Sequence, residues 1–231
     1  MALIKTPDEI LLLKNSSKAD VSVFKRIIPF IRAGITELEI AEKMESMAYE
    51  IPGVSGLAFP AIIASGPNGA QPHAEPTDRV LNNGDLVTVD FGVVLDGYTS
   101  DITRTFKLGE PDEKLNKIFE SVFRAQEAGL KAAKAGITCG TLDAVCRDLI
   151  EQDGFGEYFI HTTGHGVGKE VHEDPRIAKN SEVVLEAGMV VTIEPGIYIE
   201  GLGGVRIEDT IIITEDGNEV ITPGIEKNLV I

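Results

Sequence analysis

The amino-acid sequence predicts an α+β fold in which one unit of helix, helix and antiparallel strands occurs twice. The main observation is an internal alignment: residues 83–97 match residues 187–201 without gaps, with five of 15 positions identical and six conservative. In addition, Pro-Asp-Glu at position 7 recurs 104 residues later, and Ala-Gly-Ile-Thr at position 33 recurs 102 residues later. These repeats predict pseudo-twofold halves, about residues 5–110 and 111–225, whose two sheets join around one core.

The first half opens with two predicted helices. Thr6-Pro7-Asp8-Glu9 is a capping box with proline at the first helical position, and apolar residues then recur at helical spacing up to Gly34. The segment from Thr36 to Glu39 is a second capping box, which predicts a helix that ends near Pro52. Extended segments follow at residues 61–65, 86–94 and 99–107, with a turn at Asp96-Gly97.

The second half repeats this order. Pro111-Asp112-Glu113 predicts the start of a long helix that runs to Ala135, and a shorter helix to about Gln152 follows. Residues 187–201 predict the matching strands because they align with the first hairpin. Since no low-complexity linker separates the halves, we expect one domain over residues 1–231.

Composition and charge exclude several classes of protein. With 43% hydrophobic residues the chain can bury a core, and no run approaches the roughly 20 apolar residues of a membrane span. A net charge of −16 would repel phosphate backbones, so we expect no nucleic-acid partner. The N-terminus has charges at Lys5 and Asp8 and no signal peptide, which predicts a cytoplasmic protein. Cys139 and Cys146 fit reduced thiols on one helix face, without an assigned function.

The stretch from His161 to Pro175 concentrates features of a catalytic site. It contains three of the four histidines, at positions 161, 165 and 172, and glycines at positions 164, 166 and 168. So many glycines disfavour a helix or a packed strand, and we expect a loop whose backbone approaches another group closely. The alternative is a flexible loop that carries histidines without a shared function.

Four carboxylates lie in or near the duplicated strands. Asp90 and Asp101 flank the turn of the first hairpin, and Glu194 and Glu208 stand in the corresponding places of the second half. Antiparallel pairing can bring such residues to one face of a sheet. A single acidic residue here would commonly be an exposed strand end. Four of them in apolar strands, with a histidine and glycine segment, indicate bound cations.

These four carboxylates and one imidazole, His165, form an oxygen-rich ligand set. They carry too much negative charge for a single zinc ion, and two divalent cations would balance it. The donors favour Mn²⁺, with Co²⁺, Fe²⁺ or Zn²⁺ as alternatives. Calcium is disfavoured because the sequence has no D-x-D-x-D-G loop. We therefore expect two divalent metal ions per chain.

The ligand set resembles that of the pita-bread metallopeptidases, family M24, which include methionine aminopeptidase, prolidase and aminopeptidase P. The resemblance rests on Asp90, Asp101, His165, Glu194 and Glu208 in this order, with G-H-G-V-G and T-I-E-P-G around them. It covers nearly the whole chain and implies the pita-bread fold. It implies that Asp90 holds one metal, that His165 and Glu194 hold the other, and that Asp101 and Glu208 bridge both. A hydroxide between the metals would then be the nucleophile.

The same resemblance gives roles to further residues. Glu194 would accept a proton from the attacking water, and His73 and His172 would flank the substrate and stabilise the oxyanion and the leaving nitrogen. His161 is placed with them among the catalytic residues. His73 lies in a loop rich in glycine and proline, and on its own it would be read as a surface histidine.

Two further features resemble the Xaa-Pro peptidases within the family, namely His161 and the run from Gly203 to Asp209. Arg206 in that run would support a ligand carboxylate or contact the substrate, or it would form only a structural ion pair. We therefore expect an aminopeptidase that cleaves the Xaa-Pro bond of a peptide substrate. An Xaa-Pro dipeptidase and a methionine aminopeptidase are alternatives. A metal-free creatinase-like hydrolase and a non-catalytic peptide-binding relative are alternatives from other classes.

The sequence also departs from the Xaa-Pro peptidases. We expect their usual N-terminal domain to be absent and the site to be more open to longer peptides. A homodimer is one of the expected assembly states. The duplicated hairpins and the Val167-Gly168 segment would supply an apolar wall beside the tertiary amide of proline, which has no N–H. Eukaryotic prolidases grip a dipeptide carboxylate with an arginine that has no evident counterpart here. Arg176 is the only arginine between His172 and Glu194.

Overall fold

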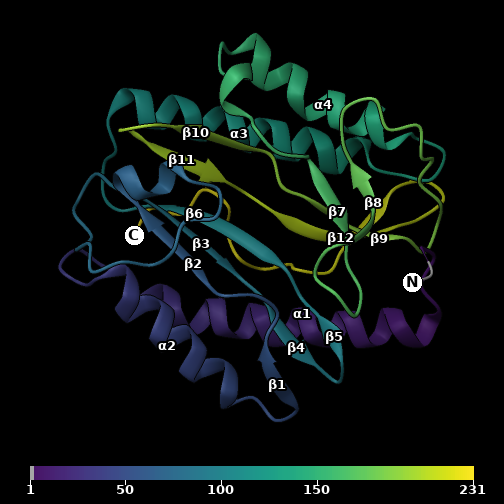
Figure 1. Cartoon of the computed structure of the whole chain (residues 1–231), viewed down its shortest axis with the longest axis horizontal. Coiled ribbons are helices and arrows are strands. Elements are labelled where there is room, and N and C mark those ends of the chain that lie inside the picture. Colours follow the sequence, from purple (N-terminus) through teal and green to yellow (C-terminus); the bar gives the residue numbers. More distant parts are fainter. Residues whose placement is uncertain (1–2) are drawn as a thin grey trace.

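Two pairs of helices flank a set of antiparallel strands in this fold. The structure, a computed structural model, describes residues 3–231. Figure 1 shows α1 (Pro7–Ile27) and α2 (Glu37–Tyr49) on one side of the strands, and α3 (Glu113–Ala132) and α4 (Cys139–Gln152) on the other. Short 3-10 helices lie at Ile28–Phe30, Gly66–Ala70 and Gly156–Tyr158. None of the helices within residues 3–231 combines the length and apolar character that a membrane crossing requires.

The four long helices begin where the sequence predicts, each behind a side-chain cap. Thr6 and Thr36 form complete capping boxes, and Asp112 and Thr138 each accept one backbone N–H. The helix ends agree less well. α1 stops before the predicted Gly34, because the chain turns into a 3-10 helix at a proline that cannot donate a backbone hydrogen bond.

The strands within residues 3–231 are all paired in antiparallel fashion. The first half contributes β1 (Val54–Leu57), β2 (Ile62–Ser65), β3 (Leu86–Phe91), β4 (Val93–Leu95), β5 (Tyr98–Thr99) and β6 (Ile102–Lys107). The second half contributes β7 (Gly164–Gly166), β8 (Glu173–Ile177), β9 (Val190–Ile193), β10 (Gly196–Ile199), β11 (Gly203–Arg206), β12 (Asp209–Ile213) and β13 (Asn218–Val220). The sheet orders are β2-β3-β6, β1-β4-β5, β13-β12-β9-β7-β8 and β10-β11.

The first hairpin is broken near its predicted carboxylates. A Cβ atom on Gly92 would lie 2.2 Å from the carbonyl oxygen of Ser100, so the two arms approach too closely for any residue but glycine. Beyond this point β4 and β5 belong to a separate sheet, in which β4 pairs with both β1 and β5. The predicted turn at Asp96-Gly97 is confirmed, with φ values of 51° and 78°. Asp90 and Asp101 lie where the two sheets separate.

The duplication is confirmed at the level of backbone conformation. Gly84 and Gly188 have φ values of 94° and 89°, and Gly97 and Gly201 have values of 78° and 74°. These pairs are equivalent in the sequence alignment, and all four values lie where glycine is favoured. β3 pairs with β6 in the first half as β9 pairs with β12 in the second. The same strand and turn geometry therefore occurs twice.

The apolar core differs from the single core that the sequence predicts. One cluster forms mainly from the first half and includes Phe24, Phe91 and Phe106. A second cluster forms mainly from the second half and includes Phe119 and Ile193. Each pair of helices covers mainly strands of its own half. A third, smaller cluster contains residues of both halves, among them Leu13 of α1 and Val190 of β9.

Polar contacts join the halves between these clusters. Thr105 Oγ1 donates to the carbonyl oxygen of Arg206 at 2.8 Å, and the backbone N–H of Glu208 donates to the carbonyl oxygen of Thr103 at 3.0 Å. β6 of the first half therefore lies along the β11 to β12 segment of the second. This seam brings the two sets of predicted ligands together.

Candidate metal centre and active site

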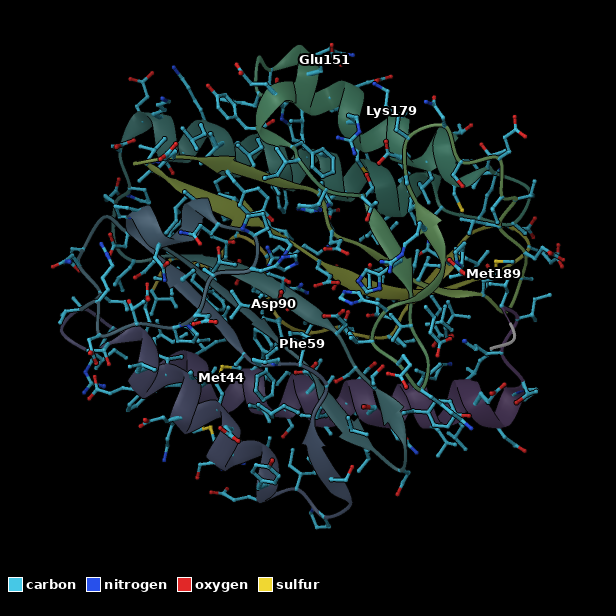
Figure 2. The ribbon with its side chains drawn as sticks, in the orientation of Figure 1. Met44, Phe59, Asp90, Glu151, Lys179 and Met189 are labelled. Atoms are coloured by element: carbon cyan, nitrogen blue, oxygen red, sulfur yellow. The ribbon has the colours of Figure 1, made fainter. Side chains whose placement is uncertain are left out.

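A pocket of about 580 Å³ is lined by residues of both halves. Figure 2 shows two of its lining residues, Phe59 and Asp90, between the helix pairs, whereas Glu151 and Lys179 lie at the periphery. A volume of this size suits a small peptide. The lining includes all nine residues that the sequence predicts for the site: His73, Asp90, Asp101, His161, His165, His172, Glu194, Arg206 and Glu208.

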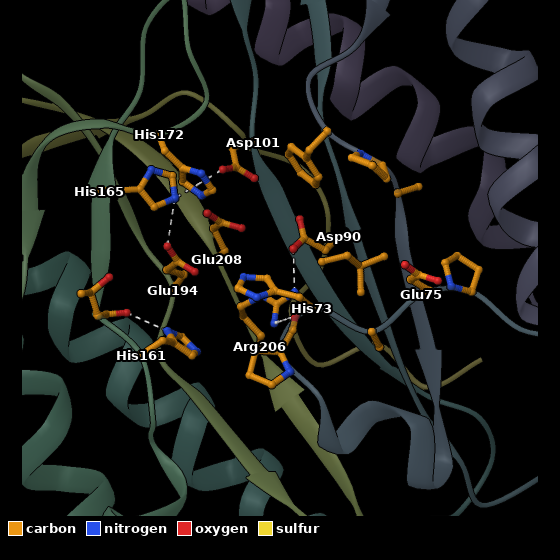
Figure 3. A pocket seen from close by; sticks show the side chains of 18 of the residues that line it. His73, Glu75, Asp90, Asp101, His161, His165, His172, Glu194, Arg206 and Glu208 are labelled. Carbon is orange, nitrogen blue, oxygen red and sulfur yellow. Dashed lines mark hydrogen bonds and ion pairs between the residues drawn. The ribbon is translucent and has the colours of Figure 1, made fainter.

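Equivalent strand positions direct four carboxylates into this pocket, as Figure 3 shows. Asp90 lies in β3 directly opposite Thr103 of β6, and Asp101 immediately precedes β6. Residues opposite one another on antiparallel strands share a face of the sheet, so these strands present their polar groups together. In the second half Glu194 follows β9 and Glu208 precedes β12. The carboxylates meet because the duplicated strands meet.

His165 joins the carboxylates from strand β7. Its Nε2 atom lies 3.1 Å from Glu194 Oε1 and 3.6 Å from Asp101 Oδ2. One ligand-type atom each of Asp101, His165 and Glu208 lies within 4.8 Å of the others. Donor atoms this close together in buried side chains can share cations.

The carboxylates carry more negative charge than the surrounding side chains balance. Burial, with the charge of Glu208, raises the pKa of Asp101 well above its usual range, and burial, with the charge of Glu194, does the same to the pKa of Glu208. Asp90 Oδ1 and Glu208 Oε1 are buried and have no hydrogen-bond partner within residues 3–231. Unpaired buried carboxylate oxygens are costly, and divalent cations would satisfy both the oxygens and the charge. The donor set therefore fits divalent metals.

Glu194 differs from the other three carboxylates because the imidazole of His165 lies within hydrogen-bond distance of it. Burial raises the pKa of Glu194, but the hydrogen bond and charge of His165 outweigh burial and bring that pKa down to about 2. Thr192 Oγ1 also donates to Glu194 Oε1 at 3.1 Å. These two contacts fix the orientation of the Glu194 carboxylate in the pocket.

The glycine-rich segment is a strand where the sequence predicted a loop, but its close backbone contacts are as expected. β7 pairs with β8 and β9. A Cβ atom on Gly164 would lie 1.9 Å from the Thr192 carbonyl oxygen, and one on Gly166 would lie 2.2 Å from the Asp174 carbonyl oxygen. The glycines therefore allow three strands to pack closely around His165.

Gly164→Ala is expected to destabilise the protein by about 1–3 kcal/mol, because its methyl group would overlap the Thr192 carbonyl oxygen. Gly217→Ala is the matched control, since a Cβ atom there would meet nothing within 4 Å. Urea unfolding of both variants measures the difference. Equal stabilities for the two variants would contradict the close packing around β7.

A buried chain of polar groups extends from Asp90 to His161. Arg206 Nη2 donates to Asp90 Oδ2 at 2.6 Å, and Arg206 Nη1 donates to the Tyr198 hydroxyl at 2.7 Å. That hydroxyl lies 2.9 Å from His161 Nε2. Burial lowers the pKa of His161, so a neutral ring can accept the Tyr198 proton while its Nδ1–H donates to the Thr162 carbonyl oxygen at 2.7 Å. Arg206 therefore forms an ion pair that also orients a predicted ligand.

The two remaining histidines lie at different parts of the pocket. The His172 ring packs against His165 in an edge-to-face contact, with ring centroids 4.4 Å apart. Partial burial, with the charge of His165, lowers the pKa of His172, which favours a neutral imidazole at pH 7. His73 is exposed and follows Pro72, whose carbonyl oxygen accepts from Arg206 Nη1 at 3.1 Å. Figure 3 shows His73 beside Arg206, away from His172.

The sequence did not identify Arg176 as a residue of the site. Arg176 lines the pocket and pairs with His165 across strands β8 and β7, so the two residues share a face. The charge of Arg176 is one of the smaller causes, after burial and the charge of His165, that lower the pKa of His172. The strand pairing that brings Arg176 here was hidden by the glycines of β7. The sequence also did not identify Tyr198, because this residue belongs to no motif.

The apolar wall of the pocket is not the one that the sequence predicts. Val167 is fully buried in a separate apolar cluster and does not line the pocket. The apolar lining instead includes Phe59 and Ile62, and Ile62 pairs with Asp90 across strands β2 and β3. The wall is therefore built by Phe59, just before β2, and by Ile62, the first residue of β2, rather than by the glycine-rich segment.

The duplicated α+β fold and a largely buried set of four carboxylates and one imidazole are features of a metallopeptidase of the pita-bread type. Residues 12–215 match metallopeptidase family M24, and the chain belongs to this family.

Similar proteins share both sequence and structure with this chain. It is 46% identical over 222 residues to the Xaa-Pro dipeptidase of Pyrococcus furiosus, an alignment that covers 96% of this chain and 64% of that protein. The structure of the Xaa-Pro dipeptidase of Bacillus anthracis superposes with a TM-score of 0.96 at 47% identity, covering 99% of this chain and 64% of that one. X-Pro aminopeptidase of Thermotoga maritima gives a TM-score of 0.94 at 40% identity, covering 99% and 65%. The chain thus spans less than two thirds of these relatives.

Proposed function

We propose that this chain hydrolyses the Xaa-Pro bond of small peptides in a metal-dependent reaction, with Xaa-Pro dipeptides as its preferred substrates. The observation that carries this proposal is the convergence of four carboxylates and His165 on one pocket, with buried oxygens that lack partners. The family supports a metal-dependent peptidase, and relatives named Xaa-Pro dipeptidase support the bond that is cleaved.

Two divalent ions, Mn²⁺ by the character of the donors, would be held by these side chains. Asp90 would hold one ion, His165 and Glu194 would hold the second, and Asp101 and Glu208 would contact both. When bound, such ions lower the pKa of water and polarise a peptide carbonyl group.

The residues of the chain then orient and move protons around the scissile bond. Glu194, which His165 and Thr192 hold in place, accepts a proton from the attacking water. His172, with its lowered pKa, is neutral and can donate one N–H to charge that develops on the substrate. His73 can donate an N–H to the substrate from the Arg206 side of the pocket.

Arg176 supports a preference for dipeptides over longer chains. It is exposed, lines the same pocket as His172, pairs with His165 across strands β8 and β7, and has no carboxylate in ion-pair contact within residues 3–231. A guanidinium in this position suits the C-terminal carboxylate of a dipeptide, which it can bind with two parallel hydrogen bonds. The sequence alone favoured aminopeptidase action first and dipeptidase action second. The place of Arg176 leads us to propose the reverse order.

The test compares Met-Pro, Met-Pro-Ala and Met-Gly-Ala with the Mn²⁺-loaded protein by following release of methionine. Met-Pro is expected to be the best substrate. Arg176→Met is expected to lower kcat/KM for Met-Pro by about 10- to 100-fold, since a hydrogen bond to a charged group contributes about 1.5–3 kcal/mol. The tripeptides are expected to be affected less, because their carboxylates extend past Arg176.

Arg32→Met is the matched control, since Arg32 is an exposed arginine that does not line the pocket. Preference for Met-Pro-Ala would support an aminopeptidase, and preference for Met-Gly-Ala would support a methionine aminopeptidase. Turnover that persists after metal chelation would contradict the metal-dependent reaction and support a creatinase-like hydrolase.

A further inference from the structure

One carboxylate of the pocket, Glu75, takes no part in the ligand cluster. Its side chain is exposed, lines the pocket, and has no cation in ion-pair contact within residues 3–231. The other charged groups of this region are already paired, since Arg206 contacts Asp90 and Arg79 contacts Asp85. Glu75 therefore presents a negative charge that only a ligand or solvent can neutralise.

The backbone that carries Glu75 is held firmly in place. The carbonyl oxygen of Glu75 accepts from Asn68 Nδ2 at 3.1 Å, and the same amide donates to the buried Glu37 Oε2 at 2.8 Å. Thr77 Oγ1 donates to that oxygen of Glu37 at 2.7 Å, so both sides of Glu75 are tied to one buried group. Ala74, the preceding residue, is also buried. The carboxylate thus extends from a preformed wall, which reduces the entropic cost of binding.

Glu75 and Arg176 belong to different ends of the pocket. Figure 3 shows Glu75 on the side of Asp90, well away from His165 and His172, whereas Arg176 pairs with His165. A dipeptide whose carboxylate contacts Arg176 and whose peptide bond lies over the ligand cluster therefore extends its Xaa side chain toward Glu75.

Apolar groups lie along this path. Ile62 is directly opposite Asp90 on the neighbouring strand, and Phe59 packs over Gly92, two residues beyond Asp90. Both residues line the pocket. An aliphatic stem can pack against such a surface while its charged end reaches a carboxylate. The Phe59 ring also favours a nearby cation.

We propose that Glu75 selects Xaa-Pro substrates whose Xaa side chain is cationic, lysine or arginine. This inference rests on the proposed function, because it requires the orientation that Arg176 gives to the substrate. The remaining carboxylates of the site are committed to the ligand cluster, so Glu75 supplies the charge that distinguishes Arg-Pro from Met-Pro and Glu-Pro.

The experiment measures kcat/KM for Arg-Pro, Lys-Pro, Met-Pro and Glu-Pro with the Mn²⁺-loaded protein and with Glu75→Gln. The ratio of Arg-Pro to Met-Pro is expected to fall about fivefold in the variant, the upper range for a solvent-exposed charge pair. The effect should shrink at high salt, which screens exposed charges. Glu182→Gln is the matched control, because it removes an exposed carboxylate that does not line the pocket, and it should leave the ratio unchanged.

Other results would overturn the inference. If Glu75→Gln lowers kcat/KM for all four dipeptides equally, Glu75 binds the α-ammonium group that they share and does not discriminate between Xaa side chains. If the ratio of Arg-Pro to Met-Pro stays constant, Glu75 has no role in selection, although the proposed function stands.

Failure of the proposed function has a separate signature, namely no turnover of any Xaa-Pro dipeptide. In that case calorimetry measures the affinities of the Mn²⁺-loaded protein for L-arginine and L-methionine, which test whether Glu75 forms a binding site for a cationic side chain. Tighter binding of L-arginine that Glu75→Gln abolishes supports the cationic subsite. Equal affinities for the two amino acids overturn it.

Discussion

Glu208→Ala is expected to lose both metal ions and to lower kcat/KM for Met-Pro by about 10³-fold or more, which corresponds to about 4 kcal/mol of transition-state stabilisation. The reason is that Glu208 lies between His165 and Asp90 in the pocket, as Figure 3 shows. Thr103 Oγ1 donates to Glu208 Oε2 at 2.6 Å, and the other oxygen, Oε1, is buried without a partner. A carboxylate held in this way can contact two ions, so its removal weakens both sites.

Elemental analysis after Mn²⁺ loading checks this expectation. The unaltered protein should approach two ions per chain, Asp90→Ala should approach one, and Glu208→Ala should approach zero. Glu215→Ala is the control, because Glu215 is an exposed residue beyond β12 that does not line the pocket. Undiminished metal content in Glu208→Ala would falsify the bridging role.

Local signals explain why so much of the fold could be predicted. Thr6 and Thr36 each cap a helix with a side chain that contacts residues only three positions away. The Asp96-Gly97 turn depends on φ values that few residues other than glycine, asparagine and aspartate adopt readily. The duplication was visible because such signals recur at the same offset. Interactions between residues close in sequence leave a pattern that the sequence alone displays.

The parts that could not be predicted depend on distant partners. Gly164 and Gly166 read as a loop, but they form a strand because neighbouring carbonyl oxygens leave no room for a side chain. That misreading hid the pairing of β7 with β8, and with it the position of Arg176. The separate cores of the two halves were also hidden, because hydrophobic periodicity shows which residues are buried but not which of them meet.

The residues of the site also divide into those that the sequence could identify and those that it could not. The sequence brought out Asp90, Asp101, Glu194 and Glu208 because an acidic residue in an apolar strand is unusual. Glu75 was missed because it lies in an exposed loop with no periodicity, and only the tertiary structure places it on the pocket wall. Chemical anomalies in regular elements can therefore be found by reading the sequence, whereas pocket residues from loops require the fold.

A buried ionic network around Asp209, the residue after Glu208, stabilises the contact between the two halves. Asp209 Oδ1 accepts from Arg104 Nη2 at 2.7 Å and from Thr222 Oγ1 at 3.0 Å, and Oδ2 accepts from Gln126 Nε2 at 3.0 Å. Lys227 Nζ lies 3.0 Å from the same Oδ2. Arg104 and Asp209 are each about 1% exposed. Removing one partner of such a pair leaves a buried charge without compensation.

Asp209→Asn is therefore expected to lower the free energy of unfolding by about 3–5 kcal/mol, because Arg104 keeps its charge and loses its counterion. The melting temperature should fall by about 10 °C. Urea unfolding of the metal-free proteins at pH 7 measures the loss without a contribution from bound ions. Asp153→Asn, which breaks a more exposed pair with Arg124, is the control and should cost less than about 1 kcal/mol. Equal losses in the two variants would contradict a special role for the buried pair.

The pH dependence of the same variant gives an independent check. Burial raises the pKa of Asp209, but the charges of Arg104 and Lys227 outweigh burial and lower that pKa in the folded protein. Since the folded-state pKa lies below the unfolded value, the stabilisation is complete above about pH 4 and is lost as the pH falls through the folded-state pKa. The difference in unfolding free energy between the unaltered protein and Asp209→Asn should therefore be constant from pH 7 to pH 5 and shrink below about pH 4. A difference that stays constant below that pH would show that Asp209 contributes through packing and not through its charge.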